Sequence, residues 1–258
     1  MKKTYLLFWL FCFSNVLAQK SILVNTVNLK ADSFVGYDAL GAIYSISDNV
    51  FTKFVDNQQW QYKNPQLGRI TKVDLQNPLK IVLFYQDFNT VVLVDNQLNE
   101  TARINLNDSE NTILPSAIGL AAGNRLWIYD SLTLRIGLYD YGKRELKNLT
   151  VPFTNNIKSY SSNFNYFRWT DEVGNAFECD VYGKIKSYGV LPVLERLQWI
   201  SDTKLIYEVD DHLFLYDLEE NKSTLIELEE KSFKNFTYND QILSIFTNHR
   251  ITNYKLAD

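Results

Sequence analysis

The chain has 258 residues, 46% of them hydrophobic and 14% aromatic, which suits one large β domain or two small ones with a well-filled core. Its formal net charge of −4 disfavours nucleic acid as a partner, because binding to phosphates requires an excess of Lys and Arg. Two cysteines, five prolines and ten glycines disfavour a disulfide-rich scaffold and long disordered or collagen-like segments.

Residues 1–18, MKKTYLLFWLFCFSNVLA, have the three regions of a secretory signal peptide. Two lysines form the basic start, an apolar run follows, and Ala18 is the small residue expected before a cleavage site. The apolar run is shorter than a membrane-spanning helix. We therefore expect cleavage after Ala18, export to the periplasm, no direct membrane insertion, and a single folded domain over residues 19–258.

After this peptide, six segments repeat one pattern of two strands. In each, a short apolar strand ends at a turn residue, and a second apolar strand follows at once. The segments begin 37 to 45 residues apart, close to the spacing of four-stranded propeller blades. In chain order they are AIYSISD (42–48) with VFTKFVDN (50–57), KIVLFYQD (80–87) with TVVLVDN (90–96), RLWIYD (125–130) with LRIGLYDYG (134–142), YFRWTD (166–171) with AFECDVYG (176–183), KLIYEVD (204–210) with HLFLYDLEEN (212–221), and QILSIFTN (241–248) with RITNYKL (250–256).

Candidate strands flank these pairs and bring the number to four in each unit. In the third unit SAIGLAAG (116–123) precedes the pair and ELKNLTV (145–151) follows it; RLQWIS (196–201) and STLIEL (223–228) flank the fifth. The sixth unit lacks a fourth strand, whereas SILVNTVNL (21–29) is a strand without a unit. We therefore predict an all-β, six-bladed β-propeller of four-stranded blades, closed by the N-terminal strand.

The most apolar stretch after the signal peptide is NPLKIVLFYQDFNTVVLVDNQLN, residues 77–99. Its charged and amide residues exclude a membrane span. The β-branched residues and the QDFN interruption disfavour a helix. We expect two strands of the second blade, apolar on both faces because a blade is packed between two others.

The third unit, RLWIYDSLTLRIGLYDYGKRELKNLTV (125–151), resembles a blade of the six-bladed YWTD/NHL-like propellers. The sequence RWTD at residues 168–171 resembles the strand that gives that family its name. The resemblance implies the fold and not an activity, because YWTD propellers bind protein ligands, whereas NHL-like relatives include binding modules and a few enzymes.

A second resemblance concerns the cell envelope. The signal peptide that ends in LAQ, the composition rich in Asn, Lys, Tyr and Phe, and residues 77–99 are similar to envelope propellers of Bacteroidota-type bacteria. Some of those proteins are accessories of the type IX secretion translocon, including a plug-type subunit at the periplasmic mouth of the pore. The resemblance implies a protein partner in the cell envelope, with an outer-membrane translocon as one such partner. The chain ends within the sixth unit and leaves no room for the C-terminal sorting domain of cargo, which favours a periplasmic protein.

The chain offers few residues for catalysis or metal binding. Cys179, His212 and His249 fall in three different units, whereas zinc sites need clustered Cys and His. No G-x-S-x-G motif and no phosphate-binding glycine motif occurs. We expect Cys179 to be a buried core residue. The sequence predicts no catalytic residue, no cofactor and no metal.

A polar residue begins the turn between the two strands of every unit: Asp48, Asp87, Asp130, Asp171, Asp210 and Asn248. Equivalent turns of a propeller lie on one face, where these residues would form a ring that docks a basic partner or holds a cation. The alternative is turn chemistry, in which Asp and Asn bond the backbone two residues on. Aspartates also begin the turns of the opposite face, at 56, 95, 140 and 217, which favours turn chemistry.

Aromatic residues at a rim and at a turn tip are the remaining candidates for binding. Trp60 and Tyr62 alternate on an outer strand within an irregular region, so both point to one side, and Phe88 lies at the tip of a hairpin turn. Such aromatics mark a protein interface or a carbohydrate site, or they pack under the following loop.

These observations favour a non-catalytic periplasmic protein-interaction module, an accessory subunit of an outer-membrane or secretion complex. The candidate partner-binding residues are Trp60, Tyr62, Phe88, Asp87, Asp130, Asp171 and Asp210. One alternative is a metal-dependent propeller hydrolase or cyclase that uses channel carboxylates, with Asp171, Glu172, Asp210 and Asp211 as candidates. Another is a carbohydrate-binding propeller.

Overall fold

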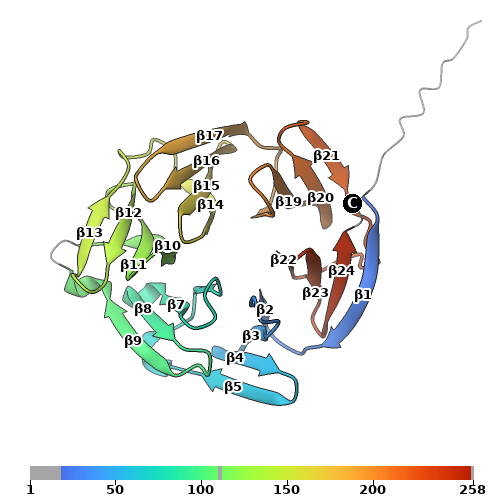
Figure 1. The fold of residues 1–258 in the computed structure, drawn as a ribbon, viewed down its shortest axis with the longest axis horizontal. Coiled ribbons are helices and arrows are strands. Elements are labelled where there is room, and N and C mark those ends of the chain that lie inside the picture. The colour runs from blue at the N-terminus through green and yellow to red at the C-terminus, as the bar shows by residue number, and fades with distance from the viewer. Residues whose placement is uncertain (1–18, 110–111, 257–258) are drawn as a thin grey trace, which may run out of the picture.

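The computed structural model describes residues 19–109 and 112–256, and the predicted signal peptide lies outside them. The described residues form six four-stranded antiparallel sheets arranged as blades around a central axis (Figure 1). They contain no α-helix, and hence none that is long and apolar enough to cross a membrane. Short 3-10 turns occur at η1 (Pro65–Leu67), η2 (Gln86–Phe88) and η3 (Leu106–Asp108). The predicted six-bladed propeller is confirmed.

The chain passes through each blade from the axis to the rim. Blade 1 is β2 (Ser33–Tyr37), β3 (Ile43–Ser47), β4 (Val50–Val55) and β5 (Gln58–Tyr62), and blade 2 is β6 (Lys72–Asp74), β7 (Ile81–Tyr85), β8 (Thr90–Val94) and β9 (Glu100–Asn105). Blade 3 is β10 (Pro115–Ala121), β11 (Arg125–Asp130), β12 (Arg135–Asp140) and β13 (Glu145–Asn148), and blade 4 is β14 (Ile157–Ser162), β15 (Tyr166–Asp171), β16 (Asn175–Asp180) and β17 (Ile185–Val190). Blade 5 is β18 (Arg196–Trp199), β19 (Lys204–Val209), β20 (His212–Asp217) and β21 (Lys222–Leu225).

The sixth blade joins the two ends of the chain. Its strands are β22 (Asn235–Asn239), β23 (Ile242–Phe246), β24 (Arg250–Leu256) and, at the rim, β1 (Ser21–Asn28), which Figure 1 shows in blue beside the red β24. β1 is antiparallel to β24, with Ser21 opposite Leu256 and Asn28 opposite Arg250. The predicted closure of the ring by the N-terminal strand is therefore confirmed.

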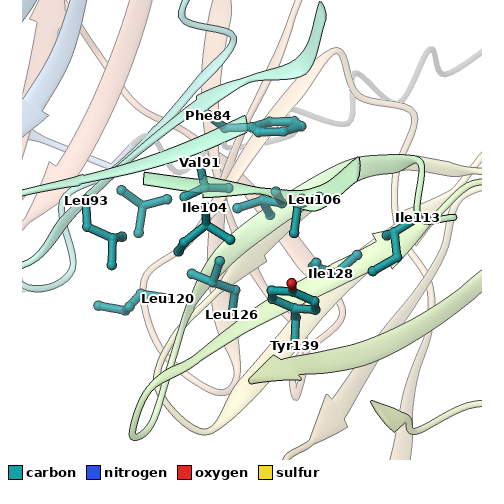
Figure 2. Packing of buried hydrophobic residues seen from close by; sticks show 12 residues of the cluster. Phe84, Val91, Leu93, Ile104, Leu106, Ile113, Leu120, Leu126, Ile128 and Tyr139 are labelled. Carbon is teal, nitrogen blue, oxygen red and sulfur yellow. The ribbon is translucent and has the colours of Figure 1, made fainter. Parts of the chain in front are cut away.

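The middle strands of the blades are apolar because they are covered on both faces. Every residue of β7 and of β8 is buried, so the apolar stretch at residues 77–99 forms two core strands, as predicted. Figure 2 shows the packing between blades 2 and 3, where Val91 and Leu93 of one blade face Leu120, Leu126 and Ile128 of the other. Truncating one such leucine to alanine costs about 2–5 kcal/mol in a packed core.

Because consecutive strands of each blade are antiparallel, equivalent turns of all blades lie on the same face of the propeller. The turn between the second and third strands of a blade lies at the same end as the segment that connects that blade to a neighbouring one. Hydrogen bonds join these turns to these connecting segments. Examples are the bond from the Ser131 amide to the Leu114 carbonyl oxygen at 2.9 Å and the bond from the Leu191 amide to the Gly174 carbonyl oxygen at 2.9 Å. We call this side the connection face.

Candidate functional site

Phe88 lies at the tip of the blade 2 turn on the connection face, and its side chain is 51% exposed. Its carbonyl oxygen accepts hydrogen bonds from Thr90 Oγ1 at 2.9 Å and from Asn107 Nδ2 at 3.3 Å. Its ring lies over Gly68, where an added Cβ would come within 3.3 Å of the ring. Gly68 also has a φ of +72°, which disfavours a larger residue there. The fold therefore holds an apolar ring at the surface in a fixed position.

Two leucines are exposed beside a buried carboxylate in blade 3. Leu132 lies in the turn between β11 and β12, and Leu114 lies in the connection that precedes β10. Asp130 is 2% exposed, and its Oδ1 accepts hydrogen bonds from the amides of Leu114 at 2.9 Å and Leu132 at 3.2 Å. Its Oδ2 accepts from Thr133 Oγ1 at 2.7 Å. Asp130 thus organises the turn, while the Leu114 and Leu132 side chains point to solvent.

Blade 4 repeats this arrangement around Asp171, which is 4% exposed. Asp171 Oδ1 accepts from the amides of Val173 and Asn175, and Oδ2 accepts from the Asn175 and Asn155 side chains at 2.8 and 3.0 Å. Burial acts to raise the pKa of this carboxyl, but these hydrogen bonds outweigh it and lower the pKa below its ordinary value. Val173 at the tip and Val193 in the next connection are strongly exposed.

Together these turns form an apolar arc across half of the connection face. We use that name for Phe88, Leu114, Leu132, Val151, Val173, Val190 and Val193. On the same face, the described turns of blades 5, 6 and 1 expose polar residues such as Asp210, His249 and Asp48. The opposite face also exposes apolar side chains, among them Leu40, Leu79 and Tyr182 in blades 1, 2 and 4, but no large one among the described residues of blade 3. On the connection face, the exposed apolar side chains of the described residues run over blades 2, 3 and 4.

The structure separates the aspartates that the sequence grouped into a ring. Asp87 and Asp210 are exposed at their turns, whereas Asp130 and Asp171 are buried and occupied by turn hydrogen bonds. Turn chemistry accounts for the two buried carboxylates, so we leave them out of the candidate docking surface.

Trp60 and Tyr62 lie on β5 at the rim of blade 1, half-buried against the core between blades 1 and 2. The Lys53 ammonium lies 5.8 Å from the centre of the Trp60 ring, and Tyr62 Oη donates to Glu100 Oε2 at 2.6 Å. Both aromatics therefore join neighbouring blades, in keeping with the packing alternative.

A cavity of about 440 Å³ in the central channel is a second candidate site. All six innermost strands line it, and its charged and aromatic lining residues include Lys72 and Asp74 of β6 and Tyr160 of β14. The Lys72 ammonium lies 4.9 Å from the centre of the Tyr160 ring. This site is not evident in the sequence, because β6 is only three residues long and its polar residues resemble a loop.

Hydrogen bonds between innermost strands surround the channel. Asp74 Oδ2 accepts from the Leu120 amide of blade 3 at 2.8 Å, and Tyr160 Oη of blade 4 accepts from the Ile118 amide at 3.1 Å. Burial raises the pKa of the Asp74 carboxyl, an effect that the Leu120 and Gln76 amides partly offset. Burial also lowers the pKa of the Lys72 ammonium and raises that of the Tyr160 hydroxyl to about 12.

The remaining candidates for chemistry lie apart from both sites. His212 and His249 are exposed on turns of the connection face, and Cys179 is buried in the core of blades 3 and 4, as expected. Within residues 19–109 and 112–256, no group of three or more His, Cys, Asp or Glu is arranged to hold a metal ion.

The sequence matches no protein-family model and no curated protein. Solved structures share its fold. Virginiamycin B lyase from Staphylococcus aureus is 11% identical, with a TM-score of 0.61 and with 94% of this chain and 96% of the lyase covered. PorZ, a surface component of the type IX secretion system of Porphyromonas gingivalis, is 10% identical with a TM-score of 0.53, and the match covers 90% of this chain and 31% of PorZ. The extracellular domain of a one-component system from B. thetaiotaomicron is 13% identical with a TM-score of 0.52, and the match covers 92% of this chain and 40% of that one. These likenesses show the β-propeller fold, and the six sheets of the described residues make this propeller six-bladed.

Proposed function

We propose that this protein is a non-catalytic protein-interaction module of the cell envelope that binds its partner through the apolar arc. The observation that carries the proposal is the run of exposed apolar side chains over three successive blades of one face. Exposed apolar patches of this kind are typical of protein-binding surfaces. Fully burying a single exposed Leu or Val side chain contributes about 1.5–3 kcal/mol, so several of them together can offset the entropy lost on association.

The arc is also held rigidly, which favours binding. The backbone of each of the three turns is fixed by hydrogen bonds, to the Phe88 carbonyl oxygen in blade 2 and to the Asp130 and Asp171 carboxylates in blades 3 and 4. These turns therefore lose little conformational entropy when a partner binds. Exposed Asp87 beside Phe88 adds a negative charge at one end of the arc, which favours a partner with an apolar patch and a basic rim.

The partner is proposed to be an outer-membrane or secretion complex of which this chain is an accessory subunit. The signal-peptide pattern of residues 1–18 supports an exported protein with Gln19 as its first residue. Among propellers of this fold, PorZ belongs to the type IX secretion system, so a secretion complex is the first place to look. Mass spectrometry of the mature N-terminus in a periplasmic fraction tests the location.

The docking surface is tested with a double variant, Leu132→Asp with Val173→Asp, in a tagged chain purified from its own cell envelope. Both side chains are exposed, so the melting temperature should stay unchanged, while affinity for the partner should fall at least about 100-fold. Leu40→Asp on the opposite face is the matched control, since Leu40 is also strongly exposed.

Recovery of one partner in near-equal amount with the wild type and the control, and its loss with the double variant, would support the proposal. Recovery of the wild type only as a free monomer, or equal recovery of the partner with the double variant, would refute docking on the arc.

A further inference from the structure

The Lys72 side chain lines the channel, where it is exposed to solvent, and its ammonium forms no salt bridge within the described residues. An ammonium has three hydrogen-bond donors, which bind water where no protein group accepts them. No side-chain hydrogen bond of Lys72 occurs within the described residues; its ammonium lies 4.9 Å from the centre of the Tyr160 ring, and the Asp74 carboxyl interacts with its charge from beyond salt-bridge distance. The ammonium is thus free to bind a ligand.

The carboxylates of the cavity are occupied elsewhere. Asp74 accepts hydrogen bonds from the amides of Leu120 and Gln76 at 2.8 and 2.9 Å. Asp38 accepts from two amides of its own turn and from Tyr44 Oη at 2.8 Å. Neither carboxylate comes within 4 Å of the Lys72 ammonium. The positive charge therefore lacks an internal counter-ion in direct contact.

A second unpaired cation lies next to Lys72. A neighbouring cavity of about 620 Å³ on the connection face is also lined by Lys72, together with Arg69. The Arg69 side chain is exposed and has no ion pair within the described residues. The acid on that side, Asp32, accepts a hydrogen bond from the Asp48 amide at 2.9 Å. The two cavities share Val35, Lys72 and Val73 as lining residues, so Lys72 stands where they meet.

We propose that the central channel binds a small molecule that carries a carboxylate or phosphate group, with the Lys72 ammonium as its counter-ion. Carboxylate and phosphate oxygens are the acceptors that form strong charge-assisted hydrogen bonds with an ammonium. Ser161 and Ser162 of β14 line the same cavity, and their hydroxyls donate no hydrogen bond within the described chain. The cavity volume falls in the range of small-molecule sites. Arg69 attracts the anion at the entrance on the connection face.

The site also predicts how binding depends on pH. The titratable groups that line the cavity are Lys72 and Asp74 of β6, Tyr160 of β14, Tyr238 of β22, Tyr37 of β2 and Asp38 just after it; Ile118 and Gln198 of β10 and β18 do not titrate. Burial raises the pKa of Tyr37 and Tyr160, so both stay neutral near pH 7. Loss of a proton from either Asp74 or Lys72 removes positive charge from the site, so affinity for the anion should fall as pH rises.

Isothermal titration calorimetry of the purified chain tests the site, with inorganic phosphate and citrate as separate probes and glucose as a neutral probe. We expect saturable binding of one anion per chain, weakened about tenfold or more in Lys72→Met, since a hydrogen bond to a charged group contributes about 1.5–3 kcal/mol. Lys147→Met, on the exposed side of β13, is the matched control and should bind as the wild type does.

The two anions distinguish a phosphate ligand from a carboxylate ligand. Arg69→Met removes a cation without touching the packed channel, so a smaller loss of affinity in that variant would support the proposal even if Lys72→Met folds poorly. Binding of neither anion, or equal binding by the wild type, Lys72→Met and Arg69→Met, would overturn it.

Discussion

Lys72 extends into the solvent of the central channel, so its charge lies inside the ring of blades rather than on the outer rim. The aromatic face of Tyr160 compensates in part for lost hydration, since a cation is attracted to the ring face. Burial still lowers the pKa of the Lys72 ammonium. The folded protein therefore disfavours the charged form of Lys72, and groups with a shifted pKa are often found at binding sites.

Lys72→Met should stabilise the ligand-free protein slightly at pH 7, because the folded environment disfavours the charge while the water of the channel keeps that effect small. The folded-state pKa of Lys72 lies below its unfolded value, so the destabilisation is fully present below the folded pKa and disappears as pH rises toward 10.5. Thermal unfolding at pH 7 and pH 10 checks this. A wild type that melts at or above the temperature of the variant at pH 7 would contradict the argument.

Cys179 is a second residue whose chemistry is set by burial. Desolvation, with smaller contributions from the charges of Asp180 and Glu178, raises the pKa of its thiol to about 12. Since the thiolate is the reactive form, a chain that begins at Gln19 should not react with Ellman's reagent at pH 8 when folded. One thiol per chain should react in guanidinium chloride. Fast reaction of the native protein would show that blades 3 and 4 open readily.

Among the elements, the innermost strands depend on close approach between blades. Gly119 of β10 illustrates this, because a Cβ added there would lie 1.8 Å from Ser162 Oγ of β14 and 2.9 Å from Ser162 Cβ. The channel wall of blades 3 and 4 therefore requires a residue without a side chain at that position.

Gly119→Ala should lower the free energy of unfolding by about 1–3 kcal/mol, since Ser162 must shift to make room. Adding Ser162→Ala removes the closest clash but leaves the Cβ contact, so the double variant should recover only part of the loss. Urea unfolding of both single variants and the double variant forms the cycle that measures this coupling. Additive losses would show that the two residues do not compete for space.

The same elements show how far the sequence could be interpreted. The alternation of β11, β12, β15 and β16 and their regular spacing predicted the middle strands, because burial on both faces leaves a strong apolar pattern. The channel was not predictable, since Lys72 meets Tyr160 only after about ninety residues of intervening chain. Likewise, sequence could not distinguish exposed Asp87 from buried Asp130, because both begin equivalent turns and differ only in what covers them.

For the whole molecule, the decisive feature is the closure of blade 6 by β1. Without β1, the edge of β24 would expose unpaired backbone groups, and exposed edges promote association between chains. Asn253 of β24 also donates through Nδ2 to Asn25 Oδ1 at 2.7 Å and to Tyr37 Oη at 3.0 Å, so it connects the closing strand with blade 1.

Deletion of residues 19–28 should abolish the single cooperative unfolding transition and cause self-association. The reason is that blade 6 loses its rim strand and the ring loses its closure. Denaturant unfolding and light scattering measure these effects. A synthetic peptide with the sequence of residues 19–29, added in excess, should restore the monomer and its cooperative transition. A deletion variant that unfolds as the wild type does would show that closure contributes little.

Closure of the ring by β1 also determines when folding can be completed. A chain that grows from its N-terminus makes β1 first, yet the strand that pairs with β1 is the last to be made, more than two hundred residues later. During that interval the backbone of β1 has no partner strand, and its apolar residues Ile22, Leu23 and Val24 are free to associate with other chains, while blades 1 to 5 can already fold. Contacts so distant along the chain form slowly. The protein should therefore be most vulnerable to proteases and to misassembly just before its synthesis is complete, when chaperones that hold extended apolar segments would help it most.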